Sequence, residues 1–502
     1  MPHQIDPEFA ALPLTAIADA ALQRAQELGV EHADVRLERI RTADLALHDA
    51  RLETSHDDDE RGLAVRVVHD GTWGFAGGLI LTPAEAVRLV DRAVEVAAVS
   101  KPVTGERIEL APEPGHGEQT WISSYDVDPF SVSEHDRIEL LADWSNRVLG
   151  AEIIRHVDAT LKQVRETKFY ADLSGTRTTQ QRVRMQCQIT GLWVDDATGR
   201  FETMRTIAPP VGRGWEFLTD ERYDWSTELA TLPEYLLEKS KAPSVEPGTY
   251  DLVVDPSNMW LTIHESIGHA TELDRALGYE ANYAGTSFAT PDQLGSLHYG
   301  SPLMHVTGDR QVEHGLASIG FDDEGVQAQT WDLIKDGLLV GYQLDRRTAA
   351  LRGIERSNGC AFADSPLHVP IQRMANVSLQ PVEDGPSTED LIGGVEDGLY
   401  VVGDKSWSID MQRYNFQFTG QRFFRIRNGV LVGQVRDAAY QATTTDFWRS
   451  MSVVGGPQTY VLGGAFNCGK GQPGQVAAVS HGCPVALFNG VRILNATQEA
   501  AQ

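Results

Sequence analysis

The sequence predicts an α+β fold: helices and antiparallel strands in the N-terminal region, then an antiparallel β-rich C-terminal domain with one short motif helix. Residues 14–28 carry apolar side chains at helical spacing. Asp70-Gly71 separates two apolar runs, as hairpin turns do. After residue 248, helix-like and strand-like segments no longer alternate, which favours an antiparallel sheet over an α/β arrangement.

The first hundred residues predict two helices around a set of strands. The helix over 14–28 ends at Gly29, and a strand follows over 35–47. Residues 56–60 are acidic, and we expect them to form a solvated loop because like charges repel. After the Asp70-Gly71 hairpin, a second helix is expected over 83–98.

The middle of the chain predicts a capped helix and a strand pair. Ser133 and Asp136 resemble a capping box that opens a helix ending near Leu149. Strands are expected over 157–170 and 177–194, around a turn at Ser174-Gly175. Cys187 alternates with polar residues in the second strand, which predicts a core thiol.

The later hairpin turns are predicted from Gly-containing pairs among apolar residues: Asp336-Gly337, Asp397-Gly398, Asn428-Gly429 and Asn489-Gly490. At 502 residues the chain is too long for one core. Stretches rich in proline and glycine predict domains over 1–100, 118–240 and 249–502.

The composition indicates which partners and which cellular compartment to expect. A net charge of -28 argues against nucleic acid and anionic membranes as partners. The N-terminus lacks the pattern of a secretory signal, and no apolar stretch reaches the ~18 residues of a membrane helix. Four cysteines do not make a disulfide scaffold. We therefore expect a cytoplasmic protein.

The stretch HESIGH, residues 264–269, follows an apolar run typical of a helix. Histidines four apart share one helix face, whereas His264 and His269 are five apart, about 140° around an ideal helix. A one-residue π-bulge would bring both rings to one ion, and Gly268 tolerates such a distortion. Without the bulge, the motif is an ordinary solvated helix segment.

A catalytic zinc site usually has three protein ligands and a water. The third ligand could be Glu272, Asp274, Cys360, Cys468 or Cys483. Residues 455–475 hold seven glycines around Cys468, which weakens a regular strand and indicates close backbone approach. A cysteine there can reach into a site, so Cys468 has a modest lead over Cys483 and Glu272.

Six segments resemble the TldD branch of the TldD/PmbA metalloprotease family, in the family's order: GLAVRVVHDGTWGFA, FYADLSGT, IHESIGHATELD, IGFDDEG, NCGKGQP and VSHGCP. The resemblance implies Zn²⁺ bound by His264, His269 and Cys468, with Glu265 as the catalytic acid. PmbA-type relatives lack the metal residues, so the chain resembles the catalytic subunit.

The expected activity is zinc-dependent hydrolysis of peptides or unfolded proteins, in which Glu265 takes a proton from water and passes it to the leaving amine. The resemblance implies a dimer, with either a second copy or a PmbA-like subunit, that encloses the site. Two alternatives stay open: a non-catalytic zinc protein with a fourth ligand such as Cys483, and a peptide-binding subunit of a protease complex. The presence of Glu265 argues against both.

Overall fold

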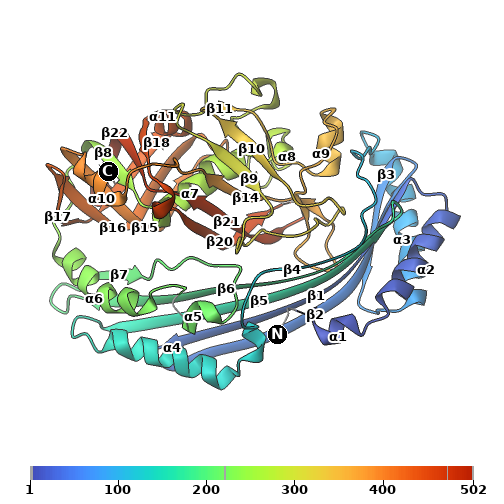
Figure 1. Ribbon diagram of the computed structural model, residues 1–502, viewed down its shortest axis with the longest axis horizontal. Coiled ribbons are helices and arrows are strands. Elements are labelled where there is room, and N and C mark those ends of the chain that lie inside the picture. Colours follow the sequence, from blue (N-terminus) through green and yellow to red (C-terminus); the bar gives the residue numbers. More distant parts are fainter. Residues whose placement is uncertain (1–3, 220–221, 472, 500–502) are drawn as a thin grey trace.

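The structure is a computed structural model that describes residues 4–219, 222–471 and 473–499. A long curved sheet runs along one side of the molecule, and the C-terminal β-rich part lies on the concave side of this sheet (Figure 1). Helices and mainly antiparallel strands occur together, which confirms the predicted α+β class. Among the described residues, no helix combines the length and apolar character that crossing a bilayer requires.

The long sheet joins strands from both predicted N-terminal regions. Its order is β3 (Thr72–Gly78), β2 (Arg51–His69), β1 (His32–His48), β5 (His156–Asp172), β6 (Thr176–Val194) and β4 (Gly117–Ile122), with β7 (Phe201–Arg205) also on β6. Strand β1 pairs with β5 along almost its whole length. Residues 1–100 and 118–240 therefore contribute adjacent strands to one sheet.

Alternation along the strands gives the sheet one apolar and one charged face. In β1, Val35 and Leu37 are buried in an apolar cluster with helix residues, whereas Arg36 and Glu38 point to the opposite face. The helices of the apolar face are α2 (Leu14–Glu27) and α3 (Pro83–Ser100) at one end, and α4 (Glu134–Leu149) and α6 (Trp225–Lys241) at the other. The charged face meets the C-terminal part.

The N-cap role of Ser133 and the core role of Cys187 are confirmed, whereas Asp136 accepts from the Ser133 hydroxyl at 2.7 Å and so forms only part of the predicted capping box. The Ser133 hydroxyl accepts a hydrogen bond from Asp136 N and caps α4. Cys187 is buried in the apolar cluster beneath α4 and α6.

The acidic stretch 56–60 is not a loop, contrary to the prediction. It lies within the exposed first half of β2, paired with β1. Arg39 and Arg41 of β1 form ion pairs with Asp59 and Asp57 across the strands, at 2.8 and 2.7 Å. Cross-strand arginines offset the repulsion that the sequence argument relied on.

Four predicted turns join paired strands, and two do not. The turns at 70–71, 174–175, 336–337 and 428–429 connect antiparallel neighbours. Asp397-Gly398 instead begins β15, and Asn489-Gly490 forms a bulge inside β22. The same residue pair suits a bulge as well as a turn, because both need a local departure from strand geometry.

The C-terminal part is built on a ring of strands. The ring is β15 (Asp397–Ile409), β8 (Gly248–Val254), β22 (Ala486–Asn495), β18 (Ala438–Thr443) and β16 (Asn415–Arg427), which pairs back to β15. Strands β17 (Val430–Val435) and β19 (Met451–Val454) extend it. Apart from the parallel pair β8–β15, these pairings are antiparallel, as predicted.

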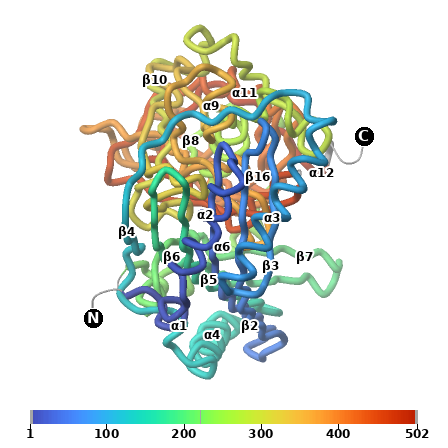
Figure 2. The backbone as a smooth tube through the Cα atoms, turned by 90° about the vertical axis from the view of Figure 1, so that its right-hand side faces the viewer, coloured from blue at the N-terminus to red at the C-terminus, as the bar shows by residue number. Residues whose placement is uncertain are grey.

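Smaller elements surround this ring. One sheet has the order β11 (Leu338–Leu339), β10 (Thr330–Lys335), β9 (Val306–Asp309) and β14 (Asn376–Leu379). The pairs β12 (Ala361–Phe362)–β13 (Ile371–Gln372) and β20 (Val461–Lys470)–β21 (Gln475–Cys483) form two-stranded units. The short helices are α1 (Pro7–Ala10), α5 (Glu216–Thr219), α7 (Pro256–Ile263), α8 (Leu273–Ala276), α9 (Arg346–Leu351), α10 (Thr388–Gly393), α11 (Thr444–Arg449) and α12 (Ala496–Glu499). Figure 2 shows α4 beneath the long sheet and the C-terminal part above it.

Candidate metal centre

The motif helix contains the predicted irregularity. Helix α7 begins after Asp255, whose carboxylate accepts a hydrogen bond from Ser257 N at 2.9 Å. Residues His264–Gly268 form a π-helical turn, closed by a hydrogen bond from His269 N to His264 O. The extra residue per turn brings the two imidazole rings to a centroid distance of 4.7 Å.

Gly268 leaves room at this turn for the side chain of Met374. Its φ of -52° is ordinary for a helix. A Cβ atom at this position would lie 2.6 Å from Met374 Sδ, closer than packing allows. The glycine therefore lets the core approach the turn closely, in addition to tolerating the π geometry.

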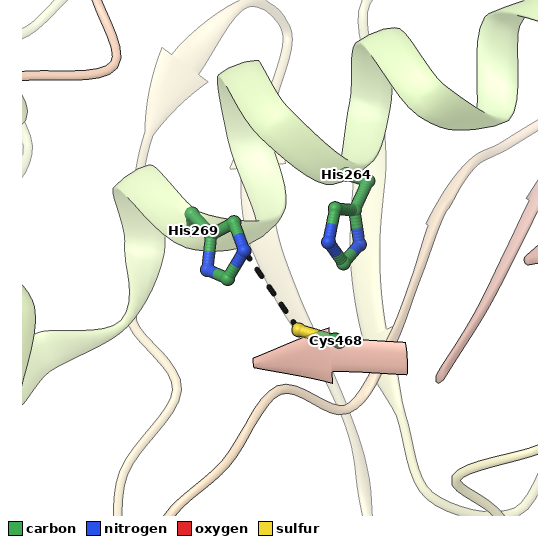
Figure 3. A group of neighbouring side chains, drawn as sticks. All are labelled: His264, His269 and Cys468. Atoms are coloured by element: carbon green, nitrogen blue, oxygen red, sulfur yellow. Dashed lines mark hydrogen bonds between the residues drawn. The ribbon is translucent and has the colours of Figure 1, made fainter. Parts of the chain in front are cut away.

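His264, His269 and Cys468 come together at the end of this turn (Figure 3). One ligand atom from each lies within 4.8 Å of the others, and Cys468 Sγ is 3.7 Å from His269 Nε2. All three side chains are buried. The structure thus brings together the three residues predicted as metal ligands.

The glycine-rich stretch reaches the site as a strand, which corrects the expectation of an irregular segment. Its central part, Val461–Lys470, is strand β20, which is bulged between Ala465 and Cys468. The expected close approach is present: a Cβ atom on Gly463 would lie 2.8 Å from Trp260 Cβ. Glycine lets β20 lie directly against α7, so that Cys468 faces the histidines.

The other cysteines considered as ligands lie elsewhere. Cys483 Sγ points to the carbonyl oxygen of Pro256 at 3.8 Å, and burial raises its pKa well above the usual value. Cys360 Sγ contacts Asn358 at 3.3 Å, and burial raises the pKa of Cys360 to about 12. Protonated thiols are poor ligands.

Glu272 and Asp274, the acidic candidates for the third ligand, instead form hydrogen bonds around the cluster. Glu272 Oε2 lies 2.7 Å from His269 Nδ1, and Lys470 Nζ donates to Glu272 and Asp274 at 3.0 and 2.9 Å. Burial by itself would raise the pKa of Glu272, but the charge of Lys470 and the contact with His269 hold this pKa well below its usual value. Glu272 is therefore an anionic hydrogen-bond acceptor for His269.

Hydrogen bonds determine which imidazole nitrogens carry protons. His481 Nδ1 donates to the carbonyl oxygen of Val377 at 2.9 Å, so its Nε2 accepts from His264 Nδ1 at 2.7 Å. Glu272 likewise requires the proton of His269 on Nδ1. Both histidines of the motif therefore have an unprotonated Nε2 that can bind a metal. Their Nδ1 atoms are held by His481 and Glu272, as is typical of residues that orient metal-binding histidines.

The ionisation of the cluster also suits a cation. Burial lowers the pKa of His264 and His269, which keeps the imidazoles neutral. Burial opposes ionisation of Cys468, but neighbouring His269 and Arg373 outweigh it and lower the pKa of the thiol. Two neutral imidazoles and a thiolate fit zinc better than magnesium or calcium.

Glu265 lies beside the cluster and has a partner that the sequence argument missed. Its Oε2 accepts a hydrogen bond from Arg413 Nη1 at 2.8 Å, and both side chains are largely buried. Arg413 comes from the turn between β15 and β16 and has a φ of 63°. Nothing in its local sequence marks it, because only the closed ring of strands brings this turn to the motif helix.

A cavity of about 290 Å³ lies beside α7 and β20, the two elements that carry the metal-ligand candidates. It is lined by Trp260 of α7, residues 463–467 of β20, and Gln186 and Gln188 from the charged face of the long sheet. Among the described residues, β20 pairs with β21 alone, so no strand is paired with its other edge. Asn467 at the end of this edge directly precedes Cys468.

Comparisons with known proteins agree with this architecture. Residues 247–495 match the PmbA/TldA metallopeptidase C-terminal domain, and residues 33–97 match PmbA/TldA metallopeptidase domain 1. A metalloprotease of Methanocaldococcus jannaschii is 25% identical over 85% of this chain and 89% of its own length. A zinc metalloprotease TldD homolog of Saccharolobus solfataricus is 23% identical, covering 92% of this chain and 96% of that protein.

The crystal structure of TldE from Thermococcus kodakarensis has a similar fold. It superposes with a TM-score of 0.69 at 15% identity, over 95% of this chain and 99% of that one. With two family domains in the expected order and relatives named as metalloproteases along most of its length, this chain belongs to the TldD/PmbA metallopeptidase family.

Proposed function

We propose that this chain is a catalytic, TldD-type zinc peptidase that cleaves peptides or unfolded proteins. The proposal rests on one observation. The side chains of His264, His269 and Cys468 are buried and lie together, and Glu265 directly follows the first of them in the chain. The two Nε2 atoms and the Cys468 thiolate would hold the ion. When bound, zinc supplies Lewis acidity, which polarises a peptide carbonyl and lowers the pKa of water.

Glu265 performs the proton transfers in this proposal. Its carboxylate accepts the proton of the attacking water and then donates it to the leaving amine. Arg413 orients the carboxylate through the 2.8 Å contact at Oε2 and leaves Oε1 for the water. The guanidinium of Arg413 also places a positive charge beside Glu265, and such a charge would favour an oxyanion that forms next to this carboxylate.

The substrate would bind as an extended strand. The unpaired edge of β20 offers backbone donors and acceptors that end at Asn467, next to Cys468. Main-chain pairing of this kind does not depend on side chains and requires an unfolded segment. We propose that a second subunit, either a copy of this chain or a PmbA-like chain, encloses this approach, and the likeness to TldE supports that arrangement.

The alternative of a closed, non-catalytic zinc site has less support. A structural site needs a fourth protein ligand, for which Cys483 is the candidate in the sequence. Cys483 Sγ points toward the Pro256 carbonyl instead. In the described part of the chain, the group around the motif contains only His264, His269 and Cys468, which leaves a position for water.

The test is zinc-dependent proteolysis by the purified chain. We expect about one tightly held zinc per chain, cleavage of unstructured casein, loss of cleavage after removal of the metal with a chelator, and recovery when zinc is restored. The assay is run on the chain alone and with a PmbA-like partner. Zinc-loaded protein that cleaves nothing under either condition would favour the peptide-binding alternative.

A further inference from the structure

The long sheet carries a second group of side chains of the types that bind metals. This group lies at the end of the sheet that α4 covers. His48 ends β1, Asp49 lies in the turn to β2, and His156 begins β5. One ligand atom from each lies within 4.8 Å of the others. In the part of the chain that the structure describes, this group and the one around the motif helix are the two that meet this condition.

The strand register explains why the two histidines meet. His48 lies directly opposite Asp158 in the antiparallel pair of β1 and β5. His156 is two residues before Asp158 and therefore projects from the same face of the sheet. The rings stack at a centroid distance of 5.2 Å with an interplanar angle of 25°. The turn residue Asp49, with a φ of 48°, brings its carboxylate to both rings.

Hydrogen bonds from outside the group hold two of its members, His48 and Asp49, whereas His156 Nδ1 is hydrogen-bonded to Asp49 Oδ2, a contact that a bound metal would replace. Asp158 Oδ1 accepts from His48 Nδ1 at 2.8 Å, so the proton of the neutral ring is held there and Nε2, 3.4 Å from Asp49 Oδ2, is the nitrogen that would bind a metal. Val157 N–H donates to Asp49 Oδ1 at 2.9 Å, and His156 Nδ1 lies 2.8 Å from Asp49 Oδ2. Metal-binding histidines and carboxylates typically form such hydrogen bonds with groups outside the coordination sphere, as His48 does with Asp158 and Asp49 with Val157 N–H.

We propose that His48 Nε2, Asp49 Oδ2 and His156 Nδ1 form a second site for a divalent transition metal of the zinc class. Two imidazoles and one carboxylate suit zinc rather than magnesium or calcium, which prefer oxygen ligands. Zinc–ligand bonds of ~2.0–2.1 Å place the ligand atoms of a tetrahedral site about 3.4 Å apart. The distance from His48 Nε2 to Asp49 Oδ2 is 3.4 Å, so these two atoms already have the required separation. The contact between Asp49 and His156 must open by roughly half an ångström.

The surroundings favour a cation that exchanges with solvent. Asp158 and Glu53 add negative charge near His48. The side chains of His48, Asp49 and His156 are 40%, 33% and 42% exposed, so water can complete the coordination. The second site should therefore bind more weakly than the buried centre. A bound ion would tie the β1–β2 turn to the start of β5 and so stabilise this end of the sheet.

Zinc titration of the full-length, metal-stripped chain by calorimetry tests the proposal, at about pH 8, where imidazole is neutral. We expect two ions per chain, one tight and one weaker, and a higher unfolding temperature when the weaker site fills. H48Q/H156Q should lose only the weaker ion and the thermal shift. His135→Gln, which changes an exposed histidine on α4, is the matched control and should keep both ions.

Two further variants make the outcome decisive. Cys468→Ser should lose the tight ion and retain the weaker one, which separates this site from the motif centre. Asp49→Asn keeps the turn, because asparagine tolerates positive φ, and should weaken the second ion by about tenfold or more. A single ion in the unchanged chain, or a second ion that survives both H48Q/H156Q and Asp49→Asn, would overturn the proposal.

Discussion

Replacement of Glu265 by glutamine tests the proposed mechanism at its central residue. Glutamine has the same shape, and its amide oxygen can still accept the hydrogen bond from Arg413 that Glu265 Oε2 now accepts at 2.8 Å. It cannot take a proton from water. We expect zinc content near that of the unchanged chain and a fall in kcat/KM of about a hundredfold or more. A hundredfold loss corresponds to about 2.7 kcal/mol of transition-state stabilisation.

The structure also explains why glutamine is a better choice than alanine. Glu265→Ala would leave the guanidinium of Arg413, whose side chain is 13% exposed, without its carboxylate partner. An uncompensated buried charge costs about 3 kcal/mol or more. Alanine would therefore lower the unfolding midpoint as well as activity, whereas glutamine separates chemistry from stability.

The assay follows casein cleavage, zinc content and thermal unfolding on the same preparations. Glu228→Gln is a matched control because Glu228 is also buried and hydrogen-bonded, to Ile207 N and Tyr223 Oη, and lies on α6 instead of the motif helix. It should leave kcat/KM unchanged. Full activity in the zinc-loaded Glu265→Gln protein would refute the role as base, and loss of zinc would show that Glu265 is a ligand instead.

Three other predictions follow from the same geometry. Cys468→Ser should remove most of the tightly bound zinc while Cys483→Ser retains it, measured by elemental analysis; the opposite result would make Cys483 the ligand. Tightly bound zinc should be retained from about pH 8 down to about 6.5 and be released only in more acidic solution, because burial lowers the pKa of His264 and His269 below 6.5, so protons displace the metal only there. Zinc release centred above pH 6.5 would contradict this. A substrate protein destabilised by ~1.4 kcal/mol should be cut roughly tenfold faster than its stable parent, because cleavage follows the unfolded population; equal rates would refute an enclosed site.

Local patterns in the sequence determined the elements and pointed to the centre. Helical spacing predicted α2, and Asp70-Gly71 predicted its hairpin, because both signals act between near neighbours. The five-residue interval between His264 and His269 predicted the π turn, because an undistorted helix cannot bring both rings to one ion. Residues 56–60 were predicted wrongly, since their partners Arg39 and Arg41 belong to another strand.

Only the tertiary structure decided which distant groups complete each site. Arg413 reaches Glu265 because β16 pairs back to β15 and closes the ring of strands. His481 orients His264 because β21 passes alongside the motif helix. His48 and His156 meet because β1 and β5 pair in one particular register. Contacts between residues more than a hundred positions apart depend on which strands pair and in what register, and that is decided by the packing of the whole chain.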